Sequence, residues 1–381
     1  MAIISLGEVD KKLIPILVGA VFSISNRLLI KYCDTNIFKH KIIANVVSIF
    51  PKILTMVPHL IIKCKSRKIK NSEIEIETNK EGELIHKDQY EEQTKGKWKY
   101  IILTTVFFFI QSILVLYSLE IKFNSWILEI LLTTVLYYKI FNLTLYKHHY
   151  ISIVSIILTG IVIDLSFGNL QSDISKNTLP FFLRLFREIF YSLHDVTNKY
   201  LMEKKYCNPY EISLYVGLFN LMYFGLFSLL SYFFLKVDNF EEYIIDFDNW
   251  EIFALISLSI IQLGFSLSCL IVNDKKTPCH IFIISVLGHL ANYFDFSTTN
   301  STILFSCLIF LLFMTLVFTE IIEINICGIS YNTNKNISKR AEMANINVGN
   351  NTTISVEDNQ NIILNESNIN NILENQNDNE F

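Results

Sequence analysis

Apolar stretches of about twenty residues recur along the chain as far as residue 322, and short polar connections separate them. An α-helix needs about 20 apolar residues to cross a hydrocarbon core roughly 30 Å thick. We therefore predict an all-α integral membrane protein with ten transmembrane helices. The predicted spans are residues 13–30, 42–62, 101–119, 125–141, 150–167, 179–201, 210–235, 250–272, 277–294 and 302–322.

The distribution of lysine and arginine predicts how these spans are oriented. With a cytoplasmic N-terminus, the inside segments hold 19 Lys and Arg residues and the outside loops hold six. Because positive charge is enriched on the cytoplasmic side, both termini are expected there. The longest inside segment, 63–99, carries ten basic and eight acidic residues and is expected to be a solvated loop. If residues 179–201 do not cross the membrane, nine spans remain and the charge bias weakens.

The sixth predicted span contains the charged stretch RLFREIFYSLHDVTNKYLMEKK, residues 184–205. On a helical wheel its polar side chains fall within an arc of about 140°, and apolar side chains fill the remaining face. Five formal charges facing lipid would cost on the order of 15 kcal/mol. The helix either crosses the membrane with its polar face towards a central cavity or lies flat at the interface. We favour the crossing helix, because the polar face mixes both signs of charge.

Polar residues of other spans supply matching groups for such a cavity. Glu129, Thr133 and Tyr137 recur every four residues and share one face of the fourth span. Ionisable groups at mid-membrane are costly, so we expect Glu129 and Arg187 to line the cavity and to pair across it. For Asn220, a hydrogen bond between helices is the alternative. The candidate substrate-binding residues are Arg187, Glu188, Tyr191, His194, Asp195, Glu129, Thr133, Tyr137, Asn220 and Asn292.

Composition narrows the function classes. Hydrophobic residues make up 51% and charged residues 18% of the 381 positions, and the mean hydropathy is +0.37. A net charge of −4 does not favour a nucleic-acid partner. The seven cysteines are never spaced as C-x-x-C, and the chain has no P-loop, H-E-x-x-H, G-x-S-x-G or Rossmann fingerprint. We expect no enzymatic activity, no cofactor and no metal site.

The two ends of the chain are predicted to be cytoplasmic. Residues 1–12 precede the first span without a small-residue cleavage site, so that span is expected to be retained. Residues 331–381 contain 16 Asn and show no periodic apolar face. This composition is typical of a disordered, low-complexity tail.

Three local stretches carry a family resemblance: FYSLHDVTNKYLMEKKYCNPYEISLYVGLFN (190–220), TPCHIFIISVLGHLANYF (277–294) and EIIEINICGIS (320–330). With the spacing of the spans, they resemble the drug/metabolite transporter superfamily, and within it the solute carrier family 35 and nucleotide-sugar-transporter branch. The resemblance covers about residues 12–330. It implies two inverted five-helix repeats, 13–167 and 179–322, around a central cavity.

The chain departs from the substrate-binding motifs of that branch. There, an F-Y-N-N stretch in the seventh span and a G-A-L-N-K stretch in the ninth contact the substrate. Here the seventh span has only Phe219 and Asn220, and the ninth reads GHLANY at 288–293, without the lysine. The missing cation puts a nucleotide-diphosphate substrate in doubt. Arg184, Arg187 or Lys199 could supply the charge from the sixth span instead.

The expected function is secondary transport of a small polar, anionic metabolite, such as a nucleotide sugar, by alternating access. Arg187 would attract the anionic group, and Glu129 would balance the charge or carry a coupling proton. Tyr137 and Asn292 would orient the solute by hydrogen bonds. The expected location is an endomembrane (Golgi, endoplasmic reticulum or vacuole) rather than the plasma membrane, and a homodimer is left open.

Two other functions remain open at this stage. One is a polytopic membrane glycosyltransferase that would use the lumenal D-x-D pair Asp246 and Asp248. The other is a non-transporting scaffold that would act through the 63–99 loop and the Asn-rich tail.

Overall fold

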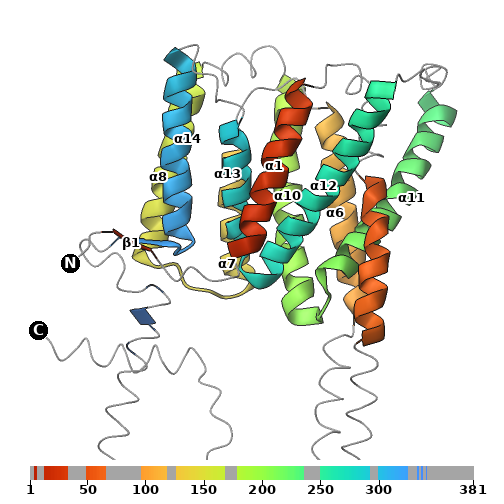
Figure 1. The fold of residues 1–381 in the computed structure, drawn as a ribbon, viewed down its shortest axis with the longest axis horizontal. Helices are drawn as coiled ribbons and strands as arrows, with labels where there is room; N and C mark the ends of the chain where they lie inside the picture. The colour runs from red at the N-terminus through yellow and green to blue at the C-terminus, as the bar shows by residue number, and fades with distance from the viewer. Residues whose placement is uncertain are drawn as a thin grey trace, which may run out of the picture.

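A computed structural model describes most of the apolar part of the chain (Figure 1). The described residues are 4–6, 13–32, 49–65, 96–117, 126–167, 178–235, 249–291, 299–324, 333, 336–337 and 340. The helices are α1 (Ile14–Tyr32), η2 (Phe50–Thr55, continued by a helix over 56–65), α6 (Lys97–Tyr117), α7 (Trp126–Ile140), α8 (Lys147–Phe167), α10 (Thr178–Lys205), α11 (Pro209–Leu235), α12 (Asn249–Lys275), η4 (Pro278–His280), α13 (Ile281–Ala291) and α14 (Thr299–Phe318).

Each of the ten predicted spans overlaps one of these helical segments. Parts of four of them, at 42–48, 118–119, 125 and 292–294, lie outside the described residues. Within the described part of the chain, three helices are long and apolar enough to cross a membrane: Lys97–Val115, Pro209–Leu230 and Ile252–Lys275. Large apolar side chains such as Leu17, Ile61 and Ile260 are exposed on the outside of the bundle. The chain is an all-α membrane protein.

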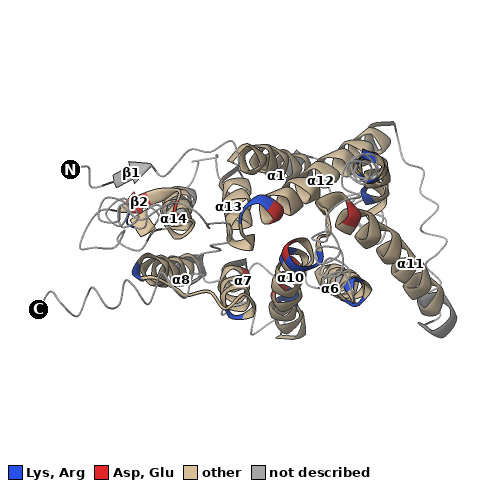
Figure 2. Cartoon of the chain, turned by 90° about the horizontal axis from the view of Figure 1, so that it is seen from below, with Lys and Arg blue, Asp and Glu red and all other residues tan. Residues whose placement is uncertain are grey.

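The helices form two layers, which are best seen along the helix axes (Figure 2). One layer holds α8, α7, α10 and α6 in this order, and the other holds α14, α13, α1 and α12. In the first layer α10 packs against both α7 and α6, and in the second α1 packs against both α13 and α12. The helix α11 packs against η2 at one end of the layers. The two central helices, α10 and α1, therefore position whatever lies in the middle of the bundle.

A two-stranded antiparallel sheet corrects the purely helical expectation. The strand β1 (Ile4–Leu6) pairs with β2 (Ile322–Ile324), with Ser5 opposite Glu323. The predicted tenth span extended to residue 322, but α14 ends at Phe318. Glu320 follows in the left-handed conformation, with φ of 59°, and the amides of Glu320 and Ile321 donate to the carbonyls of Val317 and Leu316. This Schellman ending stops the helix, which hydropathy alone does not detect.

Candidate functional site

The helix α10 carries the charged stretch that the sequence analysis singled out. Glu188, Asn198 and Lys199 on its polar face are buried against neighbouring helices, whereas Leu179 and Phe186 on its apolar face are exposed. Polar and apolar side chains lie on opposite faces of this helix because they alternate at helical spacing. Only the apolar face can meet lipid at low cost in free energy, so the polar face turns towards the other helices. The charged residues of α10 from Arg184 to Lys199 are thus buried or half-buried within the bundle.

Arg187 and Glu188 form an ion pair, and the Glu188 side chain is 0% exposed. The Tyr191 ring lies beside the Arg187 guanidinium, and 6.0 Å separate the ring centroid from Arg187 Cζ. From α7, Glu129 lies within electrostatic reach of Arg187, Glu188 and Asp195. Ser192 also donates a hydrogen bond of 3.2 Å to the Glu129 carbonyl, which holds α10 against α7. The sequence placed Glu129 and Arg187 together, but the ion pair that the structure describes joins Arg187 to Glu188.

Arg27 on α1 is not among the candidate substrate-binding residues predicted from the sequence. Its Nη2 lies 2.9 Å from Nε2 of His289 on α13. A guanidinium can only donate, so the imidazole nitrogen accepts this hydrogen bond and carries no proton. His289 also lies within electrostatic reach of Arg184 and Arg187 on α10. One arginine therefore contacts a neutral imidazole, and two arginines of the opposite layer lie within electrostatic reach of the same ring.

These residues make up a single group between α10 and α1, with contributions from α7 and α13. The central polar cluster consists of Arg27, Glu129, Arg184, Arg187, Glu188, Asp195 and His289. At 1.5 Å per residue, Arg184 and Asp195 are about 16 Å apart along α10. Arg27 lies about 20 Å from the start of α1, well inside a bilayer core. The cluster is thus an extended polar strip at mid-depth, with guanidinium groups at one end and carboxyl groups towards the other.

A buried lysine in the second span extends this strip. Lys52 in η2 is 5% exposed, and its ammonium lies 3.6 Å from the centre of the Phe108 ring. Among the residues that the structure describes, no acidic side chain forms an ion pair with it. Cys269 on α12 lies within electrostatic reach of Lys52, Asp195 and Glu129, which connects the lysine to the central polar cluster. A lysine within a predicted membrane span is the sequence signal for this position, and Lys52 is not among the candidate residues predicted from the sequence.

Lys199 has a structural task. Its Nζ donates to the carbonyls of Asn273, Asp274 and Lys276, at 2.8, 3.3 and 2.6 Å, and forms an ion pair of 2.7 Å with Glu203. These carbonyls end α12, where the helix dipole and the unpaired acceptors favour a cation. The suggestion that Lys199 supplies charge to a substrate is therefore not supported by its contacts.

Several candidate residues lie away from the cluster. His194 contacts α6, with 2.9 Å between its Nδ1 and the Thr104 hydroxyl, and Asn220 donates to the Thr105 carbonyl at 3.3 Å. The alternative considered for Asn220, a contact between helices, is what the structure describes. Tyr137 packs in a hydrophobic cluster between α7, α8, α13 and α14. Thr133 is buried, and its hydroxyl has no hydrogen-bond partner in the described part of the chain. Asn292, Asp246 and Asp248 lie outside the described residues.

A groove of about 400 Å³ lies elsewhere, between α8 and α14. Its lining is mostly apolar, and it opens to the outside of the bundle, where lipid is expected. The groove is lined by Ser155, Leu158, Thr159, Val162, Ser306, Cys307 and Phe310. None of these residues belongs to the central polar cluster, so the central cavity stays a prediction.

Comparison with models of known protein families finds no match for this chain. A comparison with curated proteins finds no significant match either. The chemistry of the central polar cluster is therefore the main indication of function.

Proposed function

We propose that the chain is a secondary transporter that moves a small polar, anionic metabolite by alternating access. The observation that carries this proposal is the central polar cluster, which lies between the two layers of an apolar helix bundle with Glu188 fully buried and its other members half-buried. Each charge at the centre of a bilayer costs about 3 kcal/mol on insertion scales, so a protein retains such groups where they act on a solute or an ion.

The two ends of the cluster suit different partners. Arg27 contacts the neutral His289 ring, Arg184 and Arg187 lie within its electrostatic reach, and such guanidinium groups can bind a carboxylate or phosphate oxygen through several N–H groups. Towards the carboxyl end, Glu129 and Glu188 lie within electrostatic reach of each other. Because two nearby carboxylates repel each other when both are charged, this pair is the candidate carrier of a coupling proton.

The packing of the helices supports the inverted five-helix repeats that this mechanism requires. If the helices α1, η2, α6, α7 and α8 are exchanged in order for α10, α11, α12, α13 and α14, the main contacts are preserved. The pair α10–α6 becomes α1–α12, and α10–α7 becomes α1–α13, both of which are packed pairs. The pairs α8–α14 and η2–α11 map onto themselves. Two such halves can rock against each other around a site between α1 and α10.

The small sheet supports an even number of spans. Because β1 and β2 are hydrogen bonded, the start of the chain and the end of α14 lie on one side of the bundle. The turn between α7 and α8 and the turn between α10 and α11 lie at the same end (Figure 1). Basic residues gather there, including Lys139, Lys147, Lys204, Lys205 and Lys275. Ten spans with this end in the cytoplasm satisfy both the pairing and the positive-inside rule. An endomembrane location is part of the proposal.

The proposal is tested by counterflow into proteoliposomes that contain the purified full-length chain. The solutes are nucleotide sugars, nucleotides, sugar phosphates, thiols and amino acids, each loaded inside and offered as a radiolabelled tracer outside. We expect at least one anionic solute to exchange. Arg187→Leu and Arg27→Gln should each lower that exchange at least about tenfold, since a charged hydrogen bond contributes about 1.5–3 kcal/mol.

Lys275→Gln is the matched control, because it removes a cation that is 58% exposed and lies outside the cluster. Its exchange should equal that of the unchanged protein. Exchange that is unchanged in Arg187→Leu would remove Arg187 from the site. No exchange of any solute in the panel, from protein shown to be folded, would count against transport itself.

A further inference from the structure

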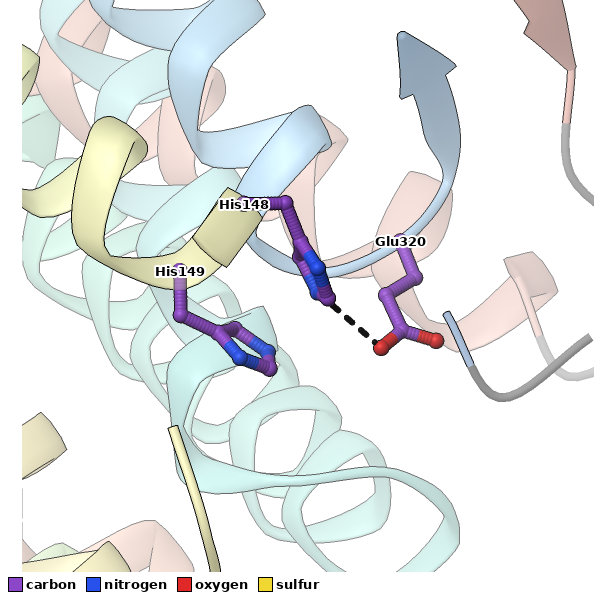
Figure 3. Close-up of side chains that lie close together, drawn as sticks. All are labelled: His148, His149 and Glu320. Carbon is purple, nitrogen blue, oxygen red and sulfur yellow. Dashed lines mark hydrogen bonds and ion pairs between the residues drawn. The ribbon is translucent and has the colours of Figure 1, made fainter. Parts of the chain in front are cut away.

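A second group of chemically active side chains lies at the end of the bundle where β1 and β2 pair, outside the central polar cluster. His148 and His149 open α8, and Glu320 lies in the turn that follows α14 (Figure 3). One nitrogen of each ring and a carboxylate oxygen of Glu320 lie within 4.8 Å of one another. His148 Nε2 is 3.1 Å from Glu320 Oε1, and the two ring centres are 3.9 Å apart.

The backbone holds all three residues in place. The two histidines are consecutive in the first turn of a 21-residue helix, so their positions depend on one rigid element. Glu320 occupies the left-handed position of the Schellman ending of α14, and its carboxylate points towards His148 at the start of α8 (Figure 3). Because α8 and α14 pack against each other, the Glu320 carboxylate lies directly beside the two histidine rings.

The hydrogen bonding of His148 is incomplete. Its side chain is 2% exposed, and Nδ1 has no hydrogen-bond partner within the described part of the chain. A buried imidazole nitrogen without a partner costs about 1–3 kcal/mol, and such a group calls for an explanation. An unpaired imidazole lone pair is also what a metal ion requires.

His149 is oriented by two neighbours. Its Nδ1 accepts a hydrogen bond of 3.0 Å from the Tyr146 amide, and its Nε2 lies 3.0 Å from the Tyr138 hydroxyl. Because Nδ1 accepts from an amide, the ring proton lies on Nε2, so a metal ion would replace the amide contact at Nδ1 while the Tyr138 hydroxyl still holds Nε2 and the tautomer. Partners of this kind, outside the ligands themselves, are typical of histidines that bind metals in proteins.

We propose that His148, His149 and Glu320 form a binding site for a divalent transition-metal ion of the zinc class. Two imidazoles and one carboxylate are a common ligand set for Zn²⁺, which leaves a fourth position for water. Hard cations such as Mg²⁺ prefer oxygen ligands, so this set disfavours them. A bound ion would tie the start of α8 to the turn after α14. The site is independent of the transport proposal.

The test uses the purified full-length chain in detergent, stripped of metal with a chelator and then titrated with Co²⁺, whose visible absorption reports tetrahedral coordination. We expect the unchanged protein to bind one more equivalent of Co²⁺ than the Glu320→Gln variant and the His148→Gln/His149→Gln variant. In these variants the affinity of that equivalent should fall at least about tenfold. Zn²⁺ should displace the Co²⁺ and raise the thermal midpoint of the unchanged protein.

His59→Gln is the control, because it removes a buried histidine from the second helical segment and leaves the three proposed ligands intact. It should retain the full equivalent of Co²⁺. If the double histidine variant does not fold, Glu320→Gln alone decides, since it keeps the size of the side chain. Equal Co²⁺ binding and equal Zn²⁺ stabilisation in the unchanged protein and in Glu320→Gln would show that His148 and Glu320 form only an ion pair, and the proposal would be wrong.

Discussion

Two cations on the same face of α10 have different roles because their partners differ. Arg187 is paired with the buried carboxylate of Glu188, inside the central polar cluster. Lys199, three turns further along, donates to three carbonyl groups at the end of α12. The helical wheel places both residues on one polar face, but it contains no information about what that face meets.

Substitution of Lys199 by Met should therefore lower stability and leave the substrate site intact. The change removes charge-assisted hydrogen bonds to buried carbonyls, so the free energy of unfolding should fall by about 2–4 kcal/mol. The substrate affinity of the folded fraction should not change. Urea unfolding in mixed micelles and counterflow at equal amounts of folded protein measure the two effects.

Lys204→Met is the matched change one turn away, since Lys204 is an exposed lysine on the same helix. It should alter stability by less than about 0.5 kcal/mol. If Lys199→Met instead unfolds normally and abolishes exchange, Lys199 belongs to the substrate site and the structural role is wrong.

At the scale of elements, the packing of α1 against α13 depends on a glycine. A Cβ atom added at Gly288 would collide with the Ser23 hydroxyl and would lie 3.1 Å from Arg27 Nε. The neighbouring residue, His289, makes the hydrogen bond to Arg27. The close approach of the two helices and the geometry of the arginine group are therefore set by the same contact.

Gly288→Ala should push α1 and α13 apart, because overpacking in a well-packed interior costs about 1–3 kcal/mol. The thermal midpoint should fall, and exchange of the anionic solute should fall with it. Removal of the colliding hydroxyl in the double variant Ser23→Ala/Gly288→Ala should recover part of both losses.

Gly225→Ala on α11 provides the comparison, because a Cβ atom at Gly225 has no neighbour within 4 Å. There the change should leave exchange intact and stabilise the helix by up to about 1 kcal/mol. Equal effects at Gly288 and Gly225 would mean that the approach of α1 to α13 is not tight.

The ends of α7 and α14 show which helix boundaries can be predicted from the sequence. The fourth span was predicted to end at residue 141, and α7 ends at Ile140, followed by Asn142 with φ of 53°. Asn accepts this conformation readily, so that ending carries a sequence signal. Glu320 takes the same role after α14 without one. The length of the tenth span was overestimated because the end of α14 carries no such signal in the sequence.

For the whole molecule, the pairing of β1 with β2 predicts that residues 4–6 and 322–324 lie side by side, and this can be tested. Leu6 lies opposite Ile322 in the register of the sheet. Opposed residues of antiparallel strands have Cα atoms about 4.5–5.5 Å apart, which lies within the range of disulfide bonds. The variant Leu6→Cys/Ile322→Cys should therefore form a disulfide under mild oxidation.

A protease site introduced between residues 66 and 95 makes this disulfide detectable, because cleavage leaves two fragments that only the disulfide joins. After cleavage, the two fragments should migrate together without reductant and separately with it. Each single cysteine variant should give separate fragments under both conditions, which excludes bonds to native cysteines. Separate fragments from the double variant would mean that the two ends of the chain do not meet, and the argument for an even number of spans would fail.

Hydropathy and helical periodicity determined the all-α membrane character, the approximate ranges of the helices and the inward polar face of α10. These properties follow from neighbours along the chain, because a helix buries or exposes residues at a fixed local spacing. Contacts between distant segments required the tertiary structure. Arg27 meets His289 across 262 positions, and His148 meets Glu320 across 172. Such pairs depend on which helices pack side by side and in what register, and no local pattern encodes that choice.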